Sequence, residues 1–116
     1  MNRSQTDAKA ITASTLYLEM RGYTIFEQNW RRSKQKIDIV AKKDETIYFV
    51  KVEYRSDAIN SLTTIDVVTE TKVKQLLDAA ERWVSEEKWG GNYELSAIEV
   101  GDPNFAIISF SDSLLY

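Results

Sequence analysis

The sequence predicts a mixed α/β fold, a single domain spanning residues 1–116 with the element order αβββαββ. Two segments repeat apolar residues every three or four positions, as helices do, and five shorter segments have the composition and alternation of strands. Three of these strands follow one another without a helix between them. This favours a central mixed β-sheet flanked by helices over a doubly wound sheet, and 116 residues is the size of one domain.

The first helix is expected from Thr6 to Arg21. Its apolar residues lie three or four positions apart and predict a buried stripe of Ala10, Ala13, Leu16, Tyr17 and Met20. Gly22 follows directly, and glycine is the usual residue in the left-handed conformation that ends a helix.

The second helix is expected to begin near Asp66 or Thr69 and to stop at Gly90-Gly91, after a polar connection over residues 56–64. Its predicted buried stripe comprises Val73, Leu76, Leu77, Ala80, Trp83 and Val84. This stripe places Trp83 in the core.

Five segments have the alternation or the β-branched and aromatic content of strands. They cover residues 23–30, 36–41, 47–54, 93–100 and 105–110. The second and third segments form a predicted hairpin. The last two are joined by strong turn formers at Gly101-Asp102-Pro103-Asn104.

Two of these strands carry paired charges, Lys36 with Asp38 and Lys51 with Glu53. Strand side chains repeat with period two, so the two charges of each pair share a face. If the hairpin turns about residues 44 and 45, opposed positions have numbers that sum to 89, which places Asp38 opposite Lys51 and Lys36 opposite Glu53. Such opposed pairs contribute roughly 0.2–1 kcal/mol each. This face is therefore either a functional site or a salt-bridge patch.

Composition excludes several kinds of chemistry. The chain has no Cys and no His, so it lacks disulfides, thiol nucleophiles, zinc-thiolate sites and the commonest general base. Catalysis would have to use carboxylates, Lys, Tyr, Ser or Thr, with an oxygen-preferring ion such as Mg²⁺. Apolar runs are short and residues 1–9 are polar, which predicts a cytosolic (cytoplasmic), soluble protein with no membrane partner.

Charge is distributed unevenly along the chain. Residues 1–55 hold 11 Lys or Arg against 7 acids, whereas residues 56–116 hold 4 against 11. The basic residues concentrate in a short segment that contains Trp30, Arg31, Arg32, Lys34 and Lys36. Such a segment can neutralise phosphates and stack a base, or it can be an ordinary solvated loop.

Several short motifs together resemble a known family. They are Tyr17-Leu18-Glu19 with Gly22-Tyr23, Asn29 with Arg31 or Arg32, Ile37-Asp38-Ile39-Val40, Phe49-Val50 with Val52 and Arg55, and Lys72 before Ala79-Ala80. In these motifs the chain resembles the bacterial YraN-like proteins, which are related to the PD-(D/E)XK or restriction-endonuclease-like nucleases and to Holliday junction resolvases. The resemblance covers nearly the whole chain and implies a restriction-endonuclease-like fold.

The resemblance also implies a divalent metal site, but this chain departs from the pattern at that site. Asp38 matches the family's first acidic ligand, whereas Lys51 replaces the second acid and Glu53 replaces the lysine two residues further on. Three more positions lack the family's residues: Ile11, Gln35 and Lys36. The segment is thus a degenerate metal site in which Asp38 is the one ligand at its expected position.

Three functions fit this pattern. The first is a nuclease-like domain that binds nucleic acid but has lost metal-dependent phosphodiester hydrolysis, with no cofactor. The second is an active nuclease with Mg²⁺ or Mn²⁺ on Asp38 and Glu53, in which Lys51 or Lys36 takes over the role of the lysine. The third is a protein-interaction module.

The residues expected to contact nucleic acid combine cations with one aromatic side chain. They are Trp30, Arg31, Arg32, Lys34, Arg55 and Lys72. The family resemblance implies DNA, including branched DNA, as the partner. The sequence leaves the oligomeric state open.

Overall fold

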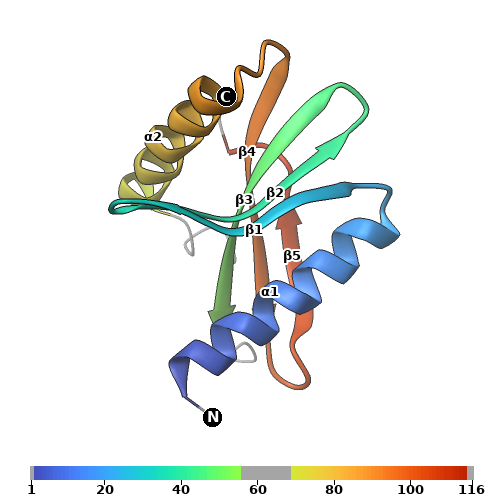
Figure 1. Ribbon diagram of the computed structural model, residues 1–116. Helices are drawn as coiled ribbons and strands as arrows, with labels where there is room; N and C mark the ends of the chain where they lie inside the picture. The colour runs from blue at the N-terminus through green and yellow to red at the C-terminus, as the bar shows by residue number, and fades with distance from the viewer. Residues whose placement is uncertain (1, 56–68, 115–116) are drawn as a thin grey trace.

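The computed structural model describes residues 2–55 and 69–114, so the predicted connection at 56–64 lies outside the described residues. Its elements are α1 (Arg3–Met20), β1 (Thr24–Arg32), β2 (Gln35–Lys43), β3 (Thr46–Arg55), α2 (Glu70–Glu87), β4 (Asn92–Gly101) and β5 (Ala106–Ser111). This order is αβββαββ, and it confirms the prediction (Figure 1). Neither of these two helices is long and apolar enough to cross a membrane.

The five strands form one mixed sheet in the order β1-β2-β3-β4-β5. Strands β3 and β4 are parallel, and every other neighbouring pair is antiparallel. A parallel pair needs a crossover, and α2 lies in the connection between β3 and β4. Consecutive residues Phe49 and Val50 belong to two different core clusters, one under α2 and one under α1. Because neighbouring strand residues face opposite ways, the two helices cover opposite faces of the sheet.

The buried face of helix α1 matches the predicted one only in part: Ala10 is buried and Tyr17 packs against the core as expected. Its buried residues are Ala10, Ile11, Ser14, Thr15 and Leu18. Leu16 and Met20 are instead 56% and 88% exposed. The predicted and the observed sets of residues both have helical spacing. The observed set is the buried one because it includes Leu18 and small residues, which let the helix lie close to the sheet. Thr15 is satisfied there, since its Oγ1 accepts a hydrogen bond from Gln28 Nε2 at 3.1 Å.

Helix α2 confirms the predicted stripe. Leu76, Ala80 and Trp83 are buried, and the indole N–H of Trp83 donates to Glu27 Oε2 at 2.7 Å. The side chain of Thr69 caps the N-terminus. The helix ends at Glu87, before the predicted glycine pair, because the residue after it takes up the left-handed conformation.

The β2–β3 hairpin has the predicted register over its paired part. Opposed positions run from Lys43 and Thr46 at the turn to Ile39 and Val50, and their numbers sum to 89. Asp44, in the turn, has a positive φ of 54°, which Asp tolerates better than most residues. The backbone pairing ends at Ile39, one residue before Asp38.

Candidate functional site

The candidate site lies where β2 leaves β3. Beyond Ile39 and Val50 the two strands no longer pair through their backbones. The freed N–H of Val52 donates instead to Oδ2 of Asp38, at 2.8 Å. Asp38 is 6% exposed and the hydrogen bond is partly buried, where a backbone N–H needs such a partner. The carboxylate is therefore fixed against the edge of β3 by the backbone itself.

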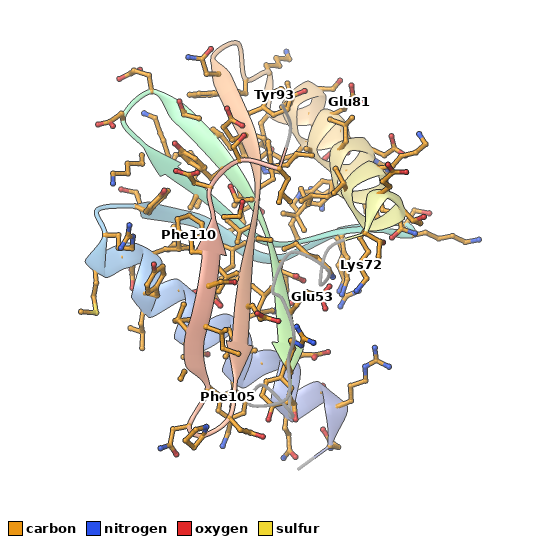
Figure 2. All side chains as sticks on the ribbon, turned by 180° about the vertical axis from the view of Figure 1, so that it is seen from behind. Glu53, Lys72, Glu81, Tyr93, Phe105 and Phe110 are labelled. Carbon is orange, nitrogen blue, oxygen red and sulfur yellow. The ribbon has the colours of Figure 1, made fainter. Side chains whose placement is uncertain are left out.

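Five charged side chains of alternating sign surround this point, and we call them the charge chain: Lys36, Asp38, Lys51, Glu53 and Lys72. Lys51 Nζ lies 3.7 Å from Asp38 Oδ2 and 3.9 Å from Glu53 Oε1. Lys36 Nζ lies 3.8 Å from Asp38 Oδ1. Lys72 Nζ donates to Glu53 Oε1 at 2.9 Å, and Figure 2 shows Lys72 of α2 beside Glu53 of β3. Each carboxylate is thus held between two ammonium groups.

The predicted cross-strand pair of Lys36 with Glu53 is wrong. Among the described residues, Glu53 makes its ion pairs with Lys51 and Lys72, whereas Lys36 pairs with Asp38. The reason is geometric, because the backbones of β2 and β3 have separated by this point and the regular pairing of the hairpin no longer applies. The other predicted pair, Asp38 with Lys51, is confirmed as an ion pair.

The charge chain lies at the junction of two clefts. The first cleft, of about 390 Å³, lies between the N-terminal half of α1, strands β1 and β2, and the end of β3. Its charged lining residues are Arg3, Asp7, Arg31, Lys36, Asp38, Lys51 and Glu53. The second cleft, of about 400 Å³, reaches α2 and has as charged lining residues Lys34, Lys36, Lys51, Lys72 and Asp78. Lys36 and Lys51 line both clefts and form the boundary between them.

Trp30 does not present the stacking surface that was expected of it. It is 3% exposed and belongs to the core under α2. The guanidinium of Arg32 lies 4.9 Å from the centre of its ring. Arg32 also pairs with Glu86 at 2.9 Å and lines neither cleft. Of the basic segment, Arg31, Lys34 and Lys36 line the clefts. Arg31 lies on the opposite side of β1 from the buried Trp30, because neighbouring strand residues face opposite ways.

Arg55 has a buried partner that sequence reasoning missed. Its Nη1 lies 2.8 Å from Oε2 of Glu99, whose side chain is 3% exposed. Glu99 stands beside Glu53 in the parallel pairing of β3 and β4. An acid inside the apolar run of residues 97–100 was the signal available in the sequence, because a buried acid needs a partner.

The residues present do not fit the divalent metal site that the resemblance implied. Ile11, at the position of an expected acid, is an apolar wall of the first cleft. The ammonium of Lys51 stands between the carboxylates of Asp38 and Glu53, where a shared cation would be. Within residues 2–55 and 69–114, no group of three potential acidic, His or Cys ligands comes together. Hard cations need several oxygen ligands, and this arrangement is neutralised already.

The mixed five-stranded sheet, with a helix on each face and a charged site where two strands separate, defines a single mixed α/β domain of the order αβββαββ. Residues 12–109 match the uncharacterised protein family UPF0102, and the chain belongs to that family.

Relatives from several bacteria support this assignment. A UPF0102 protein of Vibrio parahaemolyticus is 30% identical over 103 residues, which cover 88% of this chain and 77% of the relative. A UPF0102 protein of Vibrio campbellii is 31% identical with the same coverage. One of Bacteroides fragilis is 36% identical over 72 residues, or 62% of this chain and 59% of the relative.

Proposed function

We propose that this domain binds nucleic acid through the two clefts and does not hydrolyse it by the metal-dependent route of related nucleases. The observation that carries the proposal is the position of Lys51, whose Nζ lies 3.7 Å from Asp38 and 3.9 Å from Glu53. This one ammonium is shared by both carboxylates, and Lys36 and Lys72 add two more positive charges beside them. The cations around it remain at the mouths of the clefts, where a phosphate backbone can reach them.

The balance of charge supports the binding part of the proposal. In the second cleft, four lysines face a single acid, Asp78. The side chains of Lys36 and Lys72 are 46% and 40% exposed, so phosphates can approach them without displacing the fold. Each phosphate that a lysine neutralises releases condensed counterions, which is the main source of affinity for nucleic acid. Because the clefts share two lysines, one strand can pass from one cleft into the other.

The same geometry argues against hydrolysis. A divalent ion at Asp38 would have to displace the ammonium of Lys51 and would then lie close to it, and the two positive charges repel each other. The ion would gain as ligands only the carboxylate of Glu53 and the Asp38 oxygen that already accepts the Val52 N–H. Mg²⁺ prefers a full shell of oxygen ligands, which these two groups do not supply.

Binding is tested with a matched pair of lysines on α2. Lys72 lines the second cleft, whereas Lys74, two residues on, lines neither cleft and has a side chain that is 77% exposed. Fluorescence anisotropy with labelled DNA, over a series of salt concentrations, should show weaker binding and a salt slope lower by about 1 for Lys72→Gln. Lys74→Gln should bind as the wild type does. Absence of binding by the wild-type protein at low salt would remove the proposal and favour a protein-interaction module.

A second function has one observation in its favour. The carboxylates of Asp38 and Glu53 both point at the same atom, Lys51 Nζ. If that side chain swings away, the two acids converge on a point that Mg²⁺ or Mn²⁺ could occupy, with Lys51 or Lys36 beside the phosphate. Calorimetry with each metal, together with cleavage assays on branched, flapped and single-stranded DNA, distinguishes the two functions. Metal-dependent cleavage that disappears in Asp38→Ala would establish the active enzyme.

A further inference from the structure

We propose that Tyr54 and Phe105 form a stacking platform for an unpaired nucleobase at the end of the first cleft, so that the preferred ligand is single-stranded nucleic acid. The inference rests on the proposed function, because the clefts must first bind a phosphate backbone. It concerns residues outside the charge chain. The rings of Tyr54 and Phe105 would supply the aromatic surface that the buried Trp30 does not.

Tyr54 is held in place from two sides. It lines the first cleft, next along β3 to Glu53 of the charge chain. Its ring centre lies 5.2 Å from that of Phe105, with 36° between the ring planes. Its hydroxyl donates to Oδ1 of Asp102 at 2.6 Å. This hydrogen bond also raises the pKa of Tyr54. A ring fixed in this way loses little conformational freedom when a base stacks on it.

Phe105 reaches Tyr54 through a strained turn. Asn104 and Phe105 have φ values of 62° and 57°, a conformation that is unfavourable for a bulky side chain such as Phe. Figure 2 shows Phe105 at the turn between β4 and β5. Nζ of Lys9, from α1, lies 5.9 Å from the centre of the Phe105 ring. Strain of this kind persists where the surroundings enforce it, and it clusters at ligand clamps.

The surroundings of the platform suit an unpaired base rather than a duplex. The first cleft has apolar lining from Ala10, Ile11 and Val52 beside the cations Arg31 and Lys51. An unpaired base can place its face against the aromatic ring while its phosphates meet those cations. In a duplex both faces of each base are covered by its neighbours, so the same platform offers nothing to it. Every base has a π-face, and we therefore expect little sequence preference.

The experiment compares two labelled strands of equal length, oligothymidylate and an abasic strand that has the same backbone without bases. We expect the wild-type protein to bind oligothymidylate more tightly, by anisotropy at low salt. Tyr54→Leu should lose roughly 5- to 100-fold in affinity for oligothymidylate while its affinity for the abasic strand stays the same. Phe105→Leu should act in the same direction, and Tyr54→Phe, which keeps the ring, should retain most of the preference.

The matched control is Tyr17→Leu. Tyr17 is also partly buried and also contacts a phenylalanine, Phe110, but it lines neither cleft. It should leave the affinities for both strands unchanged. Circular dichroism establishes that each variant is folded. If Tyr54→Leu fails to fold, crosslinking of the wild-type protein to a strand with 5-iodouracil replaces it, and the crosslinked peptide should contain Tyr54 or Phe105.

The outcomes separate the two proposals. Equal affinity of the wild type for both strands, or a folded Tyr54→Leu variant that keeps the preference, overturns the stacking platform but leaves phosphate binding intact. Crosslinks confined to other peptides overturn it in the same way. Failure of the wild type to bind either strand overturns nucleic-acid binding itself, and the platform with it.

Discussion

The ammonium nitrogen of Lys51 lies 3.7 Å from Oδ2 of Asp38, the same oxygen that accepts the Val52 N–H at 2.8 Å. A single carboxylate oxygen thus serves both the backbone of β3 and a side chain of β3. In a metal-dependent nuclease that oxygen would be a candidate metal ligand. Here that oxygen accepts a backbone hydrogen bond, and the ammonium of Lys51 stands where the metal ion would be.

The first prediction concerns the replacement of that ammonium by a carboxylate. Lys51→Glu would place three acids, at positions 38, 51 and 53, around one point, and we expect their repulsion to lower the Tm. Mn²⁺ should bind between them and raise the Tm with concentration, because a ligand that binds only the folded state stabilises it. Differential scanning calorimetry measures the shift. Two controls should show a much smaller rise of the Tm with Mn²⁺. They are Lys51→Gln, which removes the ammonium without adding a ligand, and the double variant Lys51→Glu with Asp38→Asn. A Lys51→Glu protein indifferent to Mn²⁺ would mean that the carboxylates do not converge.

The second prediction concerns the structural role of Asp38. Asp38→Ala leaves the N–H of Val52 without its acceptor in a partly buried position, next to a residue that is itself 6% exposed. The free energy of unfolding should fall by about 1–3 kcal/mol, the cost of an unsatisfied buried group. Urea denaturation measures it. Asp38→Asn keeps an acceptor oxygen and should cost less, and Asp78→Asn, whose side chain is 47% exposed, should stay within about 0.5 kcal/mol of the wild type. An Asp38→Ala protein as stable as the Asp78 variant would contradict the backbone hydrogen bond.

The third prediction concerns the turn after α1. Gly22 has a φ of 93°, and a Cβ there would meet only the end of the Lys43 side chain, at 3.8 Å. The cost of Gly22→Ala is therefore conformational, and we expect roughly 1–2 kcal/mol of lost stability. Gly90 is the matched control, since a Cβ there meets nothing within 4 Å and its φ lies outside the left-handed range. Gly90→Ala should be neutral or slightly stabilising by the same denaturation measurement. Equal effects at the two positions would contradict the structure of this turn.

The fourth prediction concerns stability at high pH. Burial, and then the neighbouring Tyr48, raise the pKa of Tyr23 from 10.0 to about 12. Between these values the folded state holds a proton that the unfolded state has lost, so the free energy of unfolding falls as pH rises from 10.0 to about 12. The contribution of Tyr23 to the free energy of unfolding is fully present below pH 10.0. The pKa values of Tyr48 and Tyr54 are raised as well, so spectrophotometric titration of tyrosinate should show several delayed groups, of which the one near pH 12 is missing in Tyr23→Phe. That variant should also lose less stability over this range. Tyr93→Phe serves as the control for the loss of a hydroxyl, and a Tyr23→Phe protein that keeps the group titrating near pH 12 would assign it to another tyrosine.

Local patterns were sufficient for most of the elements. The stripe from Leu76 to Trp83 predicted the buried face of α2, because it is the one apolar face of that helix. The register of the hairpin followed from its turn, and Ile39 lies opposite Val50 as expected. In α1 the same reasoning was right for Ala10 and Tyr17 and wrong for Leu16 and Met20, because two overlapping sets of residues have helical spacing and the packing against the sheet decided between them.

The sequence by itself determined the order of elements, the hairpin register, the family and the reversal of charges at positions 51 and 53. All of these depend on periodicity or on residue identity. Only the tertiary structure decided that Trp30 is buried, that Lys72 pairs with Glu53 across 19 residues of chain, and that Glu99 lies beside Glu53. The physical reason is that these contacts join separate elements. The packing of α2 and β4 onto β3 sets their distances, and no local pattern records it.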